Sequence, residues 1–160
     1  MDVKLVNPFI NATINVLETM AFMSVDAGKA YLKKDNVAVG DVTGVLGLTG
    51  VANGTISVTF EEKCILAVVS NMFGETMKEL NSEIADAVGE LTNMISGQAR
   101  RELGEMGKVF KAAIPSVITG RDHSVTHFTD GPKIAIPFKT DSGNFTIEVC
   151  FEKSKGYTNS

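Results

Sequence analysis

Two carboxylates and an amide recur at helical spacing near the middle of the chain. The segment from 81 to 104 reads NSEIADAVGELTNMISGQARRELG and contains Asp86, Glu90 and Asn93. On a helix of about 3.6 residues per turn, these side chains lie in one row. A carboxamide both donates and accepts hydrogen bonds. Asn93 could therefore hold a water molecule in line with a phosphoryl group that another protein has already activated.

This helix must be held by its opposite face, where apolar residues recur. The predicted buried stripe consists of Ile84, Val88, Leu91 and Ile95. Gly97 and Gly104 extend the polar row, although a glycine inside a helix costs roughly 1 kcal/mol relative to alanine. We interpret Gly97 as clearance for a partner protein. Close packing against another element is the competing explanation, and it is favoured for Gly89.

The remaining segments predict an α+β fold with a mostly antiparallel sheet. A first helix should begin at Asn7-Pro8, a short one should span Glu61–Phe73, and the long one should run from Glu83 to about Leu103. Strands are predicted near 29–32, 45–48, 55–60, 133–138 and 145–151, with Pro115 leading into strands. The alternation along Thr55–Phe60 predicts a strand with one buried face.

The two halves of the chain resemble each other. Thr55–Glu61 and Thr146–Glu152 share Thr, Ile, Val, Phe and Glu at matching positions. Each segment closes a hairpin that a long helix precedes, which favours an internal helix–hairpin duplication over chance similarity. Two long helices would then pack on one continuous sheet.

Length and composition exclude several classes. The 160 residues carry 15 basic and 19 acidic side chains, a net charge of 15 − 19 = −4, which argues against a nucleic-acid binder. The longest apolar run is far shorter than the roughly 20 residues of a membrane span, and the N-terminus does not read as a secretory signal. We expect one soluble, cytoplasmic domain over residues 1–160, with a loose tail at 154–160.

Cysteine and histidine usage indicates neither a disulfide framework nor a metal cluster. Cys64 and Cys150 are expected to be small buried residues in a reducing compartment. His123 and His127 fall in a polar segment, 122–130, predicted to be a loop with one strand. We expect them to be solvated rather than metal ligands.

The row of Asp86, Glu90 and Asn93 and its surroundings resemble the CheC/CheX/FliY family of chemotaxis phosphatases. The helix signature of that family is an Asp or Ser, a Glu, an Asn and a later Pro, which here are Asp86, Glu90, Asn93 and Pro115. The segment Asn7-Pro8-Phe9 is similar to the CheX branch.

The resemblance implies dephosphorylation of the response regulator CheY. Asn93 would orient the attacking water, and Glu90 would pair with the conserved lysine of the regulator. Asp86 and Gly97 would contact the partner, Asp86 at the rim of the interface or in support of the helix. The regulator would supply the aspartyl phosphate and Mg²⁺, so no cofactor of the chain's own is expected.

The first helix does not repeat the signature. With a shift of 75 positions, Asn11, Asn15 and Glu18 stand where Asp86, Glu90 and Asn93 stand in the second long helix. The order of acid and amide is reversed, so one site is expected, as in CheX-type members. The same resemblance implies a homodimer.

Two other functions remain open from the sequence. A non-catalytic adaptor could bind a response regulator or a flagellar switch component through the same helix face. A stand-alone hydrolase of small molecules would need a pocket that the sequence does not reveal.

Overall fold

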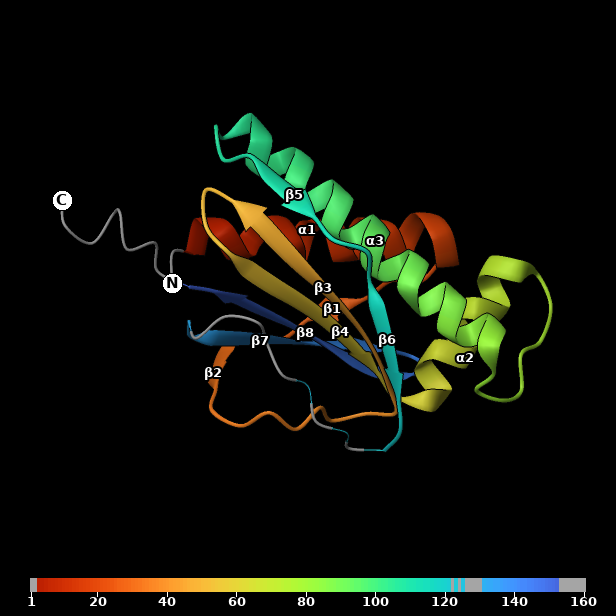
Figure 1. The fold of residues 1–160 in the computed structure, drawn as a ribbon. Helices are drawn as coiled ribbons and strands as arrows, with labels where there is room; N and C mark the ends of the chain where they lie inside the picture. The colour runs from red at the N-terminus through yellow and green to blue at the C-terminus, as the bar shows by residue number, and fades with distance from the viewer. Residues whose placement is uncertain (1–2, 122, 124, 126–130, 153–160) are drawn as a thin grey trace, which may run out of the picture.

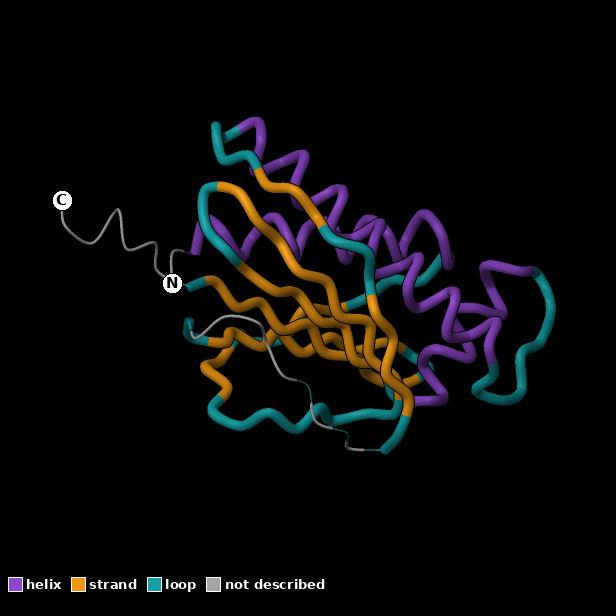
Figure 2. Tube along the Cα trace, viewed as in Figure 1, coloured by secondary structure: helices purple, strands orange, loops and turns teal. Residues whose placement is uncertain are grey.

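The computed structural model describes residues 3–121, 123, 125 and 131–152 (Figures 1 and 2). Within them, three helices and eight strands form an α+β fold, as predicted. The helices are α1 (Val3–Ala21), α2 (Glu62–Phe73) and α3 (Ser82–Glu105). The strands are β1 (Asp26–Ala27), β2 (Tyr31–Lys33), β3 (Val42–Gly50), β4 (Gly54–Phe60), β5 (Phe110–Ala112), β6 (Ser116–Thr119), β7 (Lys133–Thr140) and β8 (Gly143–Phe151).

The strands form one sheet in the order β1-β7-β8-β4-β3-β5. In addition, β2 pairs with β7 and β6 pairs with β3, and all these pairings are antiparallel. The hairpins β3–β4 and β7–β8 meet at the centre, where Ile56 is opposite Val149 and Val58 is opposite Ile147. The expectation of a mostly antiparallel sheet is confirmed.

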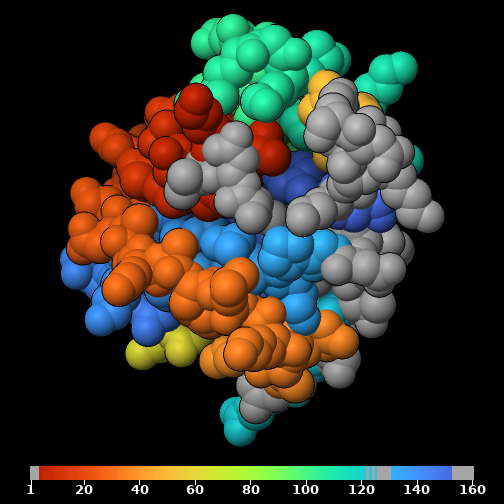
Figure 3. All heavy atoms as spheres, turned by 90° about the vertical axis from the view of Figure 1, so that its left-hand side faces the viewer, coloured from red at the N-terminus to blue at the C-terminus, as the bar shows by residue number. Residues whose placement is uncertain are grey.

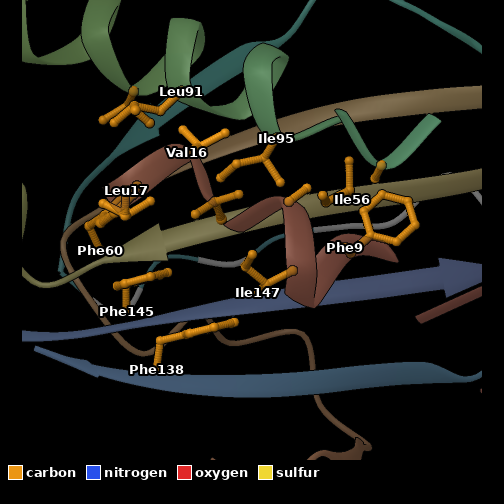
Figure 4. Close-up of a cluster of buried hydrophobic side chains, with 14 of the residues drawn as sticks. Phe9, Val16, Leu17, Ile56, Phe60, Leu91, Ile95, Phe138, Phe145 and Ile147 are labelled. Carbon is orange, nitrogen blue, oxygen red and sulfur yellow. The ribbon is translucent and has the colours of Figure 1, made fainter. Parts of the chain in front are cut away.

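The main hydrophobic core lies between the sheet and the helices. Figure 4 shows Phe9 and Leu17 of α1, with Leu91 and Ile95 of α3, gathered over the strands. The rings of Phe138 and Phe145 stack with their centroids 4.9 Å apart. The predicted stripe on α3 is fully buried: Ile84, Val88, Leu91 and Ile95.

The other face of the sheet is also covered, so the prediction of a single buried face for β4 is wrong. All seven residues of β4 are buried. Ala38 and Val125 pack with Val45 in a small second cluster on that face. Polar side chains complete the layer, because the Thr43 hydroxyl lies 2.7 Å from that of Thr59 and 2.5 Å from His123 Nε2.

A buried ion pair joins the chain segment on this second face to the centre of the sheet. Lys33 Nζ of β2 lies 2.7 Å from Glu148 Oε2 of β8, and both side chains are less than a tenth exposed. Lys33 also donates a hydrogen bond to the Val37 carbonyl. Figure 3 shows β2 and the segment after it, in orange, lying over β7, in light blue.

Several boundaries differ from the predictions. The first helix begins at Val3 rather than Asn7, with Pro8 inside it, because buried Val6 and Phe9 continue its apolar face toward the N-terminus. Proline here removes only one backbone hydrogen bond close to a helix end. The single strand expected near 29–32 is instead two short strands, β1 and β2.

The segment from β5 to the second hairpin differs from the predictions in two respects. β5 was not predicted, whereas β6 follows Pro115 as expected. His123 is half-buried, with Nδ1 2.5 Å from the Gly120 carbonyl oxygen, so the expectation that it is solvated is wrong. His127, most of the 122–130 segment and the tail at 154–160 lie outside the described residues.

Candidate functional site

Helix α3 begins at Ser82, one residue before the predicted start at Glu83. Asn81 precedes it, and its Oδ1 accepts a hydrogen bond from the Ile84 N–H at 3.1 Å. Such a cap satisfies one of the backbone donors that a helix leaves unpaired at its start. The helix continues to Glu105, close to the predicted end.

The middle of α3 lies directly on strand β3. A Cβ atom added at Gly44 would stand 2.0 Å from Thr92 Oγ1, so only glycine permits this approach. Thr92 is fully buried, and its hydroxyl donates to the Val88 carbonyl at 2.7 Å. The backbone beside Asn93 is therefore held by packing. Sequence reasoning missed both residues, although a glycine inside an apolar strand signals a close approach of another segment.

Helix α1 supports one flank of α3. Asn15 Nδ2 donates to Gln98 Oε1 at 2.7 Å, and Asn11 Nδ2 lies 3.4 Å from Glu102 Oε1. Asn11 and Asn15 of α1, which correspond to Asp86 and Glu90 in the alignment of the two long helices, therefore contact α3 itself.

The row on α3 faces solvent. Asp86, Glu90 and Asn93 are exposed, and Gly97 is partly exposed one turn further on. Among the residues that the structure describes, none of the three side chains makes a hydrogen bond or an ion pair. Their polar atoms are therefore open to a second molecule.

Packing does not account for the glycines of this helix. A Cβ at Gly97 would meet only Arg100 Nη2, at 3.8 Å, and one at Gly104 would meet nothing within 4 Å. At Gly89 the nearest atom would be Val117 Cγ2, at an ordinary 3.5 Å, so the close packing favoured for Gly89 is not required.

The sequence also led to expectations about metal sites, membrane spans and cysteines. Within the described ranges, no group of three or more His, Cys, Asp or Glu side chains is arranged to hold a metal ion. No helix in this part of the chain has the length and apolarity to cross a bilayer. Cys64 and Cys150 are buried, as predicted. Burial raises the pKa of the Cys64 thiol to about 11.

The fold and the exposed row define the class of protein as CheC-like. A CheC-like superfamily protein from Shewanella sp. PV-4 has 45% sequence identity, and the alignment covers 96% of this chain and 100% of that chain with a TM-score of 0.90. The family model for the chemotaxis phosphatase CheX matches residues 42–139, well over half of the chain. The chain belongs to the CheX family, so the resemblance read from the sequence is confirmed and the chain is classed as a phosphatase.

Two further relatives are named for an activity or for a partner. The CheY-P phosphatase CheX of Thermotoga maritima is 29% identical over 129 residues, which are 80% of this chain and 83% of that protein. The CheX of a CheX–CheY–BeF3–Mg²⁺ complex from Borrelia burgdorferi shares the fold, with a TM-score of 0.79. Its identity is 23%, and the alignment covers 92% of this chain and 97% of that one.

Proposed function

We propose that the chain dephosphorylates the aspartyl phosphate of a CheY-type response regulator. One observation carries this conclusion: Glu90 and Asn93 stand exposed and unbonded on a helix that is rigidly packed, in a member of the CheX family. Side chains placed in this way can enter the active site of another protein without first breaking contacts of their own.

Asn93 would orient the attacking water. Its amide can accept a hydrogen bond from the water and donate one to a phosphoryl oxygen. Because Thr92 fixes the adjacent backbone against Gly44, little ordering is needed when the partner binds. Positioning of this kind supplies much of the catalysis in phosphoryl transfer.

Glu90 would pair with the conserved lysine of the regulator. That ion pair would orient the two proteins and weaken the hold of the lysine on the phosphoryl group. Asp86 would contact the rim of the interface, and Gly97 would leave room for the surface of the partner. The regulator would supply both the aspartyl phosphate and Mg²⁺, in keeping with the composition of the Borrelia burgdorferi complex.

The test is the loss of aspartyl phosphate from a CheY-type regulator in the presence of Mg²⁺. Asn93→Ala should reduce turnover at least about a hundredfold while largely keeping regulator binding, since it removes a group that acts on the reacting atoms. Glu90→Ala should lose both turnover and binding. Glu105→Ala, an exposed change at the end of the same helix, is the matched control and should resemble the wild type.

Other outcomes would favour other functions. A regulator that is bound but decays at its own rate with and without the protein would indicate the adaptor. Hydrolysis of small phosphate esters that persists in Asn93→Ala would indicate a stand-alone hydrolase. An Asn93→Ala variant as fast as the wild type would contradict the proposed role of this side chain.

We further propose a single domain, a homodimer and an internal duplication. One hydrophobic core shared by α1, α2, α3 and the central strands supports the single domain. Exposed Tyr31 and Leu32 on edge strand β2 would support pairing between two copies. Sedimentation of the purified chain at several concentrations tests the dimer.

The central pairing of the β3–β4 and β7–β8 hairpins supports duplication.

A further inference from the structure

Ile114 is an isoleucine that the fold does not bury. Its side chain is 90% exposed, the highest exposed fraction among the large hydrophobic residues that are exposed in the described part of the chain. It lies on the connection between β5 and β6, and residues on both sides of it, Ala112 and Val117, pack against the core. Its exposure is therefore a local feature of a well-packed segment.

The backbone around Ile114 is fixed. Ala112 is opposite Leu48 of β3, whereas Ser116 is opposite Val45, so this edge advances 116 − 112 = 4 residues against 48 − 45 = 3. The extra residue makes a bulge, which turns side chains away from the regular pattern of the strand. The Ala113 N–H donates to the Gly47 carbonyl at 3.0 Å. Pro115 restricts the backbone of Ile114, the residue that precedes it.

The bulge lies beside the part of α3 that carries Asn93. On one side of it, Val117 reaches Gly89 of α3. On the other side, the turn into β5 is tied to the end of the helix, where the Lys108 N–H donates to the Leu103 carbonyl at 2.9 Å. Figure 1 shows β5 running alongside α3, and both β5 and β6 contact the helix.

Gly97 has no side chain that could obstruct a partner. A Cβ atom added at Gly97 would meet only Nη2 of Arg100, at 3.8 Å. A protein surface that covers Asn93 could thus extend over Gly97 toward the β5–β6 bulge.

We propose that Ile114 is an apolar contact for the receiver domain that docks on α3, an inference that rests on the proposed function. Asp86, at the rim of the interface, adds little affinity, because an ion pair that stays exposed to water contributes little. A large apolar side chain on a fixed backbone adds affinity when a partner covers it, because its apolar surface is then removed from water. The occupant is the phosphorylated regulator rather than a second copy of the chain, because the bulge continues the surface that carries Glu90 and Asn93.

The experiment compares Ile114→Ser with the wild type. Turnover is measured over a range of phosphorylated CheY-type receiver domain with Mg²⁺, and binding is measured with the same domain loaded with BeF3⁻. We expect KM and Kd to rise about tenfold to a hundredfold, as for exposing a buried isoleucine, with kcat at saturation unchanged. Ile114→Val should stay close to the wild type. Val39→Ser, which removes a side chain that is 68% exposed on the segment covering the other face of the sheet, should change neither constant.

The outcomes separate this inference from the proposed function. Wild-type KM and Kd in Ile114→Ser, with Asn93→Ala inactive, would overturn the role of Ile114 and leave the phosphatase intact. Binding without turnover in the wild type would overturn the phosphatase, while the effect of Ile114→Ser on Kd would still decide the contact. A change in self-association alone would assign Ile114 to a second copy, and a wild type that neither binds nor acts would overturn both proposals.

Discussion

At the scale of single residues, packing and chemistry are divided between neighbours on α3. Thr92 is fully buried and bonded within the helix, whereas Asn93 is exposed and makes no side-chain hydrogen bond to the described residues. Successive helical residues are about 100° apart around the axis. One residue can therefore hold the helix while the next remains free for a partner.

Gly97 is predicted to favour partner binding at a cost in helix stability. Gly97→Ala should raise the free energy of unfolding by roughly 0.5–1 kcal/mol, because alanine favours the helix and its Cβ meets only Arg100 Nη2 at 3.8 Å. The same change should weaken regulator binding. Denaturant unfolding and a binding titration measure the two effects.

Gly104→Ala is the matched control, since a Cβ there meets nothing within 4 Å. It should leave binding unchanged. Equal binding by Gly97→Ala and the wild type would remove the case for clearance at this position.

Cys64 should make the protein less stable in alkali. Burial raises the pKa of its thiol from 9.0 to about 11, so between these values the unfolded chain loses a proton that the folded chain keeps. The free energy of unfolding should then fall with pH, by at most about 1.4 kcal/mol per pH unit for one group. Urea unfolding at several pH values between 9 and 11 measures the slope, which should be shallower in Cys64→Ala.

At the scale of elements, long periodic segments could be predicted and short ones could not. The apolar stripe predicts α3, and α2 ends at Phe73 as predicted, just before Gly74, which has φ 71°. Strands of two or three residues such as β1 and β5 are too short to show alternation. They form because a neighbouring strand offers free backbone groups, which is a tertiary effect.

The contact between β3 and α3 should be sensitive to one added carbon. Gly44→Ala would bring its Cβ to 2.0 Å from Thr92 Oγ1, so the helix must move or the strand must distort. We expect a loss of about 1–3 kcal/mol in the free energy of unfolding and slower turnover, because Asn93 follows Thr92.

A double-mutant cycle tests this contact. Thr92→Ala removes the closest atom and should recover part of the loss in Gly44→Ala, as measured by denaturant unfolding. Strictly additive effects would mean that the two positions do not interact.

At the scale of the whole molecule, the covering of the second face could not be predicted. Ser57 and Thr59 alternate with apolar residues as they would on a solvated face, yet both are buried. The covering segment near Ala38 is short and polar, so its place depends on distant partners such as His123. By contrast, the composition of the row on α3 could be predicted, since it needs only helical spacing within one segment.

The buried ion pair of Lys33 and Glu148 should contribute more to the free energy of unfolding than the exposed pair of Lys33 and Asp35. Lys33→Met removes the ammonium group that lies 2.7 Å from the buried Glu148 carboxylate, which should cost roughly 3–5 kcal/mol of unfolding free energy. Asp35→Ala is the control, because Asp35 is exposed and lies 3.9 Å from Lys33, so its loss should cost less than about 1 kcal/mol. Thermal or urea unfolding distinguishes the two, and equal losses would contradict the importance of the buried pair.

The central position of β4 has a consequence for hydrogen exchange. Its seven residues are buried, and β3 and β8 pair with it on either side, so local opening exposes none of its amides to water. These amide protons should exchange with deuterium only when the whole molecule unfolds. Their rates in native protein would then report global stability directly, and variants on the face of α3 that only disturb partner binding should leave those rates unchanged.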